Sequence, residues 1–298
     1  MSDRINVIAV TWNMTDHCNL TCANCNHSSP LMDRGFLDLE QFERDLGVLE
    51  NVMHAEEIKL LGGEPMLHPK ISDAVKLAKA SKVADKVRII SNGVLLHRAD
   101  DDFWSNIDIL EISVYPGVKY KGGGEDGLQA YRDKAAEHGV HFYLPPRWDF
   151  KKTLLNNRIE DPVLVDYIYR NCGQISKWGC HTVQDGRYYK CGPAPYLEPR
   201  MAKRGEPVKN KEIDSVPLHD NPNLRQELAE YLNSEKPLKA CEYCLGENGV
   251  MVEHKMLRKQ EIIDENMADD GDIQKQVYFP PAQRVQMMVK RKLLRVIQ

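Results

Sequence analysis

The segment Cys18-Asn-Leu-Thr-Cys22-Ala-Asn-Cys25 follows closely on Ile5-Asn-Val-Ile-Ala-Val-Thr-Trp12, an apolar stretch that predicts a buried strand. Its three cysteines, at gaps of four and three residues, form a ligand set with one place missing. Three thiolates can hold three irons of a [4Fe–4S] cluster and leave the fourth iron open, whereas a structural metal site would need a fourth protein ligand. The spacing leaves a second interpretation open, in which His17 or His27 completes a closed zinc site.

A second motif, Gly62-Gly63-Glu64-Pro65, follows the run Glu57-Ile-Lys-Leu-Leu61, which predicts a short parallel strand. Two glycines let the backbone come close to a ligand, and the glutamate offers an acceptor for an ammonium group. The same tetrapeptide also fits an ordinary turn between a strand and a helix. Because the carboxyl ends of parallel barrel strands open onto one rim, we expect this motif and the cysteine segment to lie together.

With these two motifs the chain resembles the radical S-adenosylmethionine (radical SAM) enzymes. In that family the open iron of the cluster is chelated by the amino and carboxylate groups of S-adenosylmethionine, and a Gly-Gly-Glu-Pro segment hydrogen-bonds the amino group. The resemblance implies that the reduced cluster cleaves the cofactor and that a 5′-deoxyadenosyl radical takes a hydrogen atom from substrate. It covers roughly residues 5 to 150, and it assigns the cluster to Cys18, Cys22 and Cys25 and the cofactor to Gly62, Gly63, Glu64 and Pro65. The residue before the third cysteine is usually aromatic in the family, but here it is Asn24.

Strand and helix patterns alternate through the rest of the first half. Further strands are predicted before Asn92, before Ser113 and at Phe142-Tyr143-Leu144, with helical periodicity over 39–53, 70–81 and 125–138. This alternation predicts an α/β fold, a partial (β/α)₆ TIM-like barrel that is open on one side. By resemblance, Asn92 and Ser113 contact the ribose and methionine parts of the cofactor, although both residue types also serve as turn and backbone partners.

Five more cysteines lie in the second half: Cys172, Cys180, Cys191, Cys241 and Cys244. The alternating residues around Gln184-Asp-Gly186 predict a hairpin that begins at Cys180. Thirteen residues separate Cys172 from Gly186, and four separate Gly186 from Cys191, which resembles the pattern of SPASM modules and of the shorter twitch modules. That resemblance implies an auxiliary [4Fe–4S] cluster on Cys172, Cys191, Cys241 and Cys244. Four sulfur ligands would equally suit a zinc ion.

Cys180 is left over by this assignment. It could replace Cys172 as a ligand, be a small buried hydrophobic residue, or give a hydrogen atom to a substrate radical. The role of Cys180 decides between two possible reactions of the substrate radical. If the substrate radical passes its electron to the auxiliary cluster, the product is a ketone. If the Cys180 thiol returns hydrogen to the opposite face, the product is an epimer.

The cysteine spacing is similar to that of the 2-deoxy-scyllo-inosamine dehydrogenases and the neomycin epimerases. The resemblance therefore implies an oxidoreductase that acts on a carbinol carbon of a sugar-like, aminocyclitol or aminoglycoside substrate. Candidate substrate contacts follow the last predicted strand at Tyr143, Arg147, Trp148 and Asp149, although this proline-containing stretch also fits a rigid packing loop. An epimerase, a peptide-modifying maturase and a noncatalytic iron–sulfur or zinc scaffold stay open as alternatives.

The 298 residues fit a barrel with an appended module. We expect a barrel core over 1–150, a twitch-type module over 151–253 and an extension over 254–298, in which 264–272 is an exposed connector and 281–298 a basic helix.

Composition restricts the partners. The net charge of −4 gives no reason to expect nucleic acid. No apolar run has the length of a transmembrane helix or the form of a signal peptide, so we expect a cytoplasmic protein without membrane contact and with reduced thiols. Its expected partners are the small-molecule substrate and an electron donor such as flavodoxin or ferredoxin.

Overall fold

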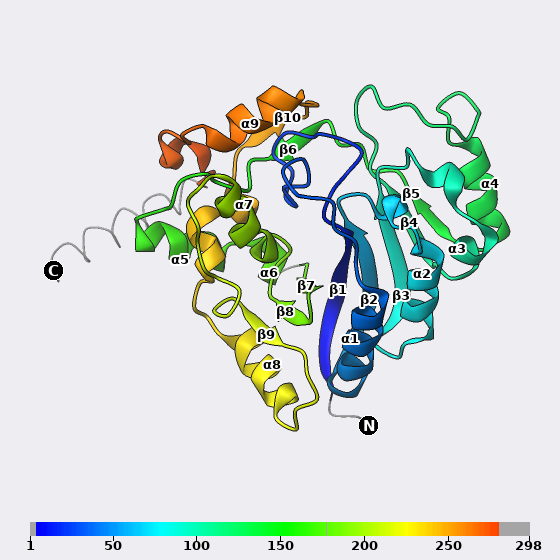
Figure 1. The fold of residues 1–298 in the computed structure, drawn as a ribbon, viewed down its shortest axis with the longest axis horizontal. Coiled ribbons are helices and arrows are strands. Elements are labelled where there is room, and N and C mark those ends of the chain that lie inside the picture. The colour runs from blue at the N-terminus through cyan, green and yellow to red at the C-terminus, as the bar shows by residue number, and fades with distance from the viewer. Residues whose placement is uncertain (1–3, 177, 280–298) are drawn as a thin grey trace, which may run out of the picture.

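The computed structural model describes residues 4–176 and 178–279, without the side chains of Ser176 and Cys180. The described part contains an eight-stranded sheet in the order β5-β4-β3-β2-β1-β7-β8-β9 and a separate strand pair (Figure 1). The sheet strands are β1 (Ile5–Thr15), β2 (Met53–Gly62), β3 (Ala84–Ser91), β4 (Ile109–Ile112), β5 (His141–Tyr143), β7 (Cys180–Gln184), β8 (Arg187–Tyr189) and β9 (Ser215–Pro217); the pair is β6 (Asp149–Lys151) and β10 (Met251–Glu253). The α-helices are α1 (Leu39–Val52), α2 (Ile71–Ala80), α3 (Asp101–Ser105), α4 (Gln129–Glu137), α5 (Pro162–Arg170), α6 (Gly173–Ser176), α7 (Leu197–Lys203), α8 (Leu224–Asn233) and α9 (Lys259–Met267).

The main sheet confirms the predicted α/β fold, since β1 to β5 pair in parallel in chain order. The sixth parallel strand is not the next one after β5. It is β7, which pairs with the other edge of β1 and places Cys180 in register with Ala9. The inner strand β1 is buried from Ala9 to Thr15 because it has neighbours on both sides. The sheet therefore extends past residue 150, where the predicted barrel core ends.

Helices α1 to α4 line the outer side of strands β1 to β5 (Figure 1). The predicted helices at 39–53 and 70–81 match α1 and α2 within a residue, whereas α4 begins four residues later than predicted. Helix α1 begins after Asp38, whose carboxylate accepts the backbone N–H groups of Glu40 and Gln41. The helix buries Phe42, whose ring packs edge-on against Trp12 of β1 at 5.2 Å between centroids.

The hairpin predicted around Gly186 is formed by β7 and β8, which pair antiparallel. Its two turn residues, Asp185 and Gly186, have φ values of 49° and 68°. Two central residues with positive φ match the tight type I′ turn, whose twist suits a two-residue hairpin. Strand β8 then pairs with β9, so the hairpin extends the main sheet.

A second buried cluster lies beyond the main sheet and collects side chains from α5, α7 and the 3₁₀ helix η4 (Lys239–Tyr243). The C-terminal part of the described chain leaves β10 and continues through α9, which lies above α7 in the view of Figure 1. No helix among the described residues has the length and apolarity needed to cross a bilayer. The basic helix predicted at 281–298 lies outside the described residues.

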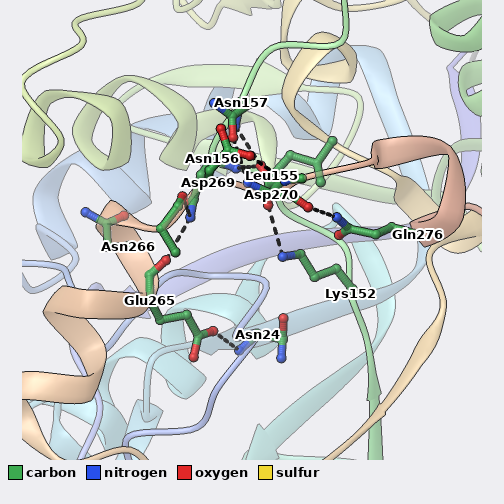
Figure 2. A network of polar contacts seen from close by, with 12 residues as sticks. Asn24, Lys152, Leu155, Asn156, Asn157, Glu265, Asn266, Asp269, Asp270 and Gln276 are labelled. Carbon is green, nitrogen blue, oxygen red and sulfur yellow. Dashed lines mark hydrogen bonds and ion pairs between the residues drawn. The ribbon is translucent and has the colours of Figure 1, made fainter.

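The stretch 264–272, expected to be an exposed connector, is mostly exposed but contains a buried anchor (Figure 2). The Asp270 side chain is only 1% exposed and forms an ion pair with Lys152 at 3.0 Å. Its other oxygen accepts the backbone N–H groups of Asn156 and Asn157, at 2.5 and 2.7 Å. This carboxylate therefore fixes the C-terminal segment to the residues after β6, a role that the acidic composition of the segment did not indicate.

Candidate active site

The Gly-Gly-Glu motif is fastened to the end of β1 just before the first cysteine. Gly63 donates its N–H to the carbonyl of Thr15 at 2.7 Å, and Glu64 donates its N–H to the carbonyl of His17 at 3.2 Å. Gly62 has φ +116°, and a Cβ atom built on Gly63 would lie 1.8 Å from the His17 carbonyl oxygen. The glycines are thus required first by the close passage of the cysteine segment. The two sequence motifs form one structural unit.

The Glu64 carboxylate is fully buried, which raises the pKa of this group to about 7. It accepts the Ser91 hydroxyl at 2.6 Å, the Asn92 N–H at 2.7 Å and the Met66 N–H at 3.0 Å. The side chain therefore ties the end of β2 to the end of β3 and does not line the cavity described below. Of the residues in this motif, the two glycines line the cavity, and the role of the Glu64 carboxylate as an acceptor for an ammonium group stays a prediction.

The three cysteines of the first segment line one cavity of about 520 Å³ at the carboxyl ends of the parallel strands. Burial, with a smaller contribution from the mutual repulsion of the three thiolates, raises the pKa of Cys18 and of Cys22 to about 12. A bound metal centre reverses such a shift, because its positive charge deprotonates coordinating thiols. The three buried cysteines are thus better suited to bind a cationic cofactor as thiolates than to remain without a ligand.

The cysteine loop is braced by a segment more than 200 residues away in sequence. Ala23 donates its N–H to the carbonyl of Lys255 at 3.0 Å, and Leu257 donates its N–H to that of Thr21 at 2.8 Å. Asn24 has φ +57°, a left-handed conformation that asparagine tolerates better than an aromatic residue does. The Asn24 N–H donates to the Glu265 carboxylate of α9 at 3.3 Å (Figure 2).

The remaining predicted cofactor residues, Asn92 and Ser113, also line the cavity. The Asn92 amide donates to Asn19 Oδ1 at 2.7 Å and lies 3.6 Å from Cys18 Sγ. The Ser113 hydroxyl faces the Arg147 guanidinium at 3.4 Å. The structure thus brings the predicted residues that follow β1, β2, β3 and β4 together at one rim.

Two of the four predicted substrate contacts line the cavity, and two do not. Arg147 lines it, held by an ion pair with Glu111 at 2.8 Å, and so does Asp149. Trp148 is 59% exposed and Tyr143 is 44% exposed, and neither lines the cavity.

Sequence reasoning missed several lining residues, among them Lys59, Glu111, Lys151 and Glu247. The signal for Lys59 was the alternation of charged and apolar residues from 57 to 61. Such a pattern places the charged residues on one face of a strand. In a barrel that face is the interior, where the reaction cavity lies.

The four cysteines assigned to the auxiliary cluster line a second, small cavity: Cys172, Cys191, Cys241 and Cys244. The Cys172 sulfur accepts backbone N–H groups of Gln174, Ile175 and Glu247. The Cys244 sulfur accepts the N–H of Gly246 at 3.2 Å. Backbone donors aimed at sulfur are a feature of iron–sulfur sites, where they stabilise thiolate charge and tune the cluster.

No three His, Cys, Asp or Glu side chains among the described residues are grouped closely enough to bind a single metal ion. His27 does line the cavity of the first three thiols, but His17 does not. Burial lowers the pKa of His27 to about 4, so its ring is neutral.

Gln174 and Pro193 line both cavities and thus form a common wall between them. Cys180, the candidate hydrogen donor, begins β7 two residues before Thr182, which lines the larger cavity. The Cys180 side chain lies outside the described part of the chain.

Residues 12–115 match the model of the Radical SAM superfamily. Over 88 residues the chain is 38% identical to a GTP 3′,8-cyclase of Chlorobaculum tepidum, covering 30% of this chain and 26% of that protein. Over 90 residues it is 34% identical to the mycofactocin maturase MftC of Mycobacterium ulcerans, covering 30% of this chain and 24% of that protein. The chain therefore spans about a quarter of the length of these relatives.

Among solved structures, BtrN in an open conformation aligns over 80% of this chain and 88% of its own, with a TM-score of 0.47 and 13% identity. BtrN in complex with AdoMet and 2-DOIA aligns over 49% of this chain and 58% of its own, with a TM-score of 0.37 and 17% identity. The motif residues, the parallel sheet and the superfamily match agree on residues 12–115. These residues form a radical SAM domain.

Proposed function

We propose that the chain is a radical SAM oxidoreductase that converts a carbinol carbon of a sugar-like, aminocyclitol or aminoglycoside substrate to a ketone. The observation that carries this proposal is the common wall of Gln174 and Pro193, which adjoins both the reaction cavity and the second group of four cysteines. An electron acceptor in the second cavity would lie directly beside a substrate radical in the first. The proposal divides the chain into a core over 1–150 and a twitch-type module over 151–253.

In this proposal the first three cysteines hold a [4Fe–4S] cluster, and the two glycines, Asn92 and Ser113 hold S-adenosylmethionine. The chemistry that these groups supply when bound is a 5′-deoxyadenosyl radical that removes hydrogen from the carbinol carbon, with the auxiliary cluster as acceptor of the remaining electron. Loss of the hydroxyl proton then completes the two-electron oxidation. A reductant such as flavodoxin or ferredoxin supplies the first electron.

The chain's own residues confine and orient the substrate. The Glu111 carboxylate holds the Arg147 guanidinium over the cavity, and the ion pair of Lys151 with Glu247, at 2.6 Å, joins β6 to the predicted second module. Both pairs position hydrogen-bonding groups around a polar ligand, as a polyol requires.

The test is an anaerobic assay of the reconstituted, dithionite-reduced protein with S-adenosylmethionine and a panel of aminocyclitols and sugars in heavy water. We expect 5′-deoxyadenosine together with a product two mass units lighter than the substrate. No 5′-deoxyadenosine with any member of the panel, alone or with added flavodoxin, would contradict the proposal.

An epimerase is the second candidate, and the position of Cys180 near the cavity-lining residue Thr182 favours it. The same assay separates the two reactions. An isomeric product that carries one nonexchangeable deuterium, and that is lost in a Cys180→Ala variant, would identify the epimerase.

A further inference from the structure

Three residues on adjacent strands form a row across the inner wall of the barrel. Thr11 of β1 is in register with Lys59 of β2 on one side and with Thr182 of β7 on the other. All three residues line the reaction cavity. The row lies below the carboxyl ends of the strands, where the cysteines and glycines line the same cavity.

This row presents hydrogen-bond donors to the cavity. In the part of the chain that the structure describes, no residue forms a hydrogen bond or an ion pair with the Lys59 ammonium or with the hydroxyls of Thr11 and Thr182. Thr11 and Thr182 are 5% and 1% exposed, and Lys59 is half-buried. Buried or half-buried donors are normally paired, because an unpaired one loses the hydrogen bonds that it makes in water.

Glu57 of β2 and Glu111 of β4 are already neutralised by arginines. Both Glu57 oxygens accept from Arg88, each at 2.8 Å. Glu111 pairs with Arg88 at 3.2 Å and with Arg147 at 2.8 Å. Glu57 contributes only a longer-range attraction to Lys59. Both acids are thus paired, and the Lys59 ammonium has no ion-pair partner among the described residues.

We infer that Lys59, Thr11 and Thr182 form a subsite for an oxyanion of the substrate, either a phosphate or a carboxylate. An ammonium and two hydroxyls can donate to the several oxygens of such a group, and an ammonium without an ion pair favours an anion at this position. The inference rests on the proposed function, because that function places the substrate in the cavity that these three residues line. It narrows the substrate to an anionic sugar or cyclitol, because a polycationic aminoglycoside would be repelled by Lys59.

The test compares binding of four probes to the reconstituted protein with S-adenosylmethionine present, by anaerobic calorimetry. Glucosamine 6-phosphate and glucosamine test a phosphate, and glucuronate and glucose test a carboxylate. We expect one anionic probe to bind at least about tenfold more tightly than its neutral or cationic partner, the factor that corresponds to one charge-assisted hydrogen bond. Lys59→Gln should remove this preference, and Lys59→Arg should keep most of it.

Lys86→Gln is the matched control, because Lys86 is an exposed lysine on the adjacent strand β3 that does not line the cavity. It should bind all four probes as the wild type does. The inference is overturned if neither anionic probe is preferred by the wild type, or if Lys59→Gln keeps the preference. It is also overturned if Lys59→Gln weakens only S-adenosylmethionine, which would assign Lys59 to the cofactor carboxylate.

Reductive cleavage of S-adenosylmethionine is measured on the same preparations. The anion subsite and the proposed function can then be contradicted independently of each other. Cleavage without any anion preference contradicts the subsite alone. An anion preference without cleavage contradicts the proposed function alone.

Discussion

The carbonyl oxygen of His17 lies so close to Gly63 that a Cβ atom at this position would be 1.8 Å away from it. This contact joins the residue before the first cysteine to the middle of the Gly-Gly-Glu-Pro motif. The identity of Gly63 therefore reports on the position of the cysteine loop as well as on cofactor binding.

Gly63→Ala should displace the cysteine loop, because the new methyl group can be accommodated only if the backbone at His17 moves. We expect iron content to fall to about half of the wild-type value, as one of two four-iron clusters is lost, and reductive cleavage of S-adenosylmethionine to be abolished. Gly47→Ala is the control, since no atom lies within 4 Å of the new Cβ on helix α1. That variant should gain about 0.5–1 kcal/mol of stability. Full iron content in Gly63→Ala would refute the account.

The sequence was sufficient to predict those parts of the site that short, contiguous sequence patterns determine. It located β1, the cysteine loop, β2 and the glycine motif, because hydrophobic runs and turn residues determine these elements over short distances. The hairpin turn at Asp185 and Gly186 was also predicted, since few residues adopt two successive positive φ values.

The rest depended on contacts that no local pattern encodes. The pairing of 21–23 with 255–257 and the position of β7 beside β1 join segments far apart in sequence. The burial of Glu64 behind the motif could not be predicted either, because it depends on where β3 ends. The same holds for Trp148, whose exposure depends on the direction of the chain after β5.

Gly246→Ala probes the second cysteine group in the same manner. Gly246 has φ +53°, and a Cβ there would lie 2.9 Å from Cys172 Sγ. We expect iron to fall to about half while cleavage of S-adenosylmethionine persists, because only the auxiliary site is disturbed. Gly205→Ala, with φ +76° and no atom within 4 Å, reproduces the backbone strain without the clash. If both variants lose iron equally, the loss is caused by backbone strain, and contact with the proposed cluster site does not explain it.

The buried carboxyl of Asp45 should make the stability of the fold depend on pH, independently of the metal sites. Burial on helix α1 raises the pKa of its carboxyl from 3.8 to about 6, although Gln41 donates to it at 2.8 Å. The protonated group therefore stabilises the fold below pH 3.8, and this contribution is lost as pH rises through about 6. Asp45→Asn should be more stable than the wild type by about 2 kcal/mol above that pH, with the difference shrinking toward pH 5.

Chemical denaturation at several pH values between 5 and 8 measures this difference. Glu43→Gln on the exposed face of the same helix controls for the loss of one negative charge. A stability difference that does not change with pH would show that Asp45 is not the titrating group.

Asp270→Asn should loosen the C-terminal segment, because it removes the charge that pairs with Lys152. We expect a loss of about 2 kcal/mol, less than for a fully buried pair because Lys152 is partly exposed. Hydrogen exchange should increase at Asn156 and Asn157, whose N–H groups donate to Asp270. Asp264→Asn, an exposed residue of α9, should leave both stability and exchange unchanged. Equal effects of the two variants would contradict the anchoring role.

The most direct test of the central claim compares Cys22→Ala with Cys244→Ala in the reconstituted, reduced protein. The account predicts that each variant keeps about half of the wild-type iron, that Cys22→Ala forms no 5′-deoxyadenosine, and that Cys244→Ala forms it without releasing oxidised product. Ketone formation by Cys244→Ala at the wild-type rate, or cleavage of S-adenosylmethionine by Cys22→Ala, would contradict it.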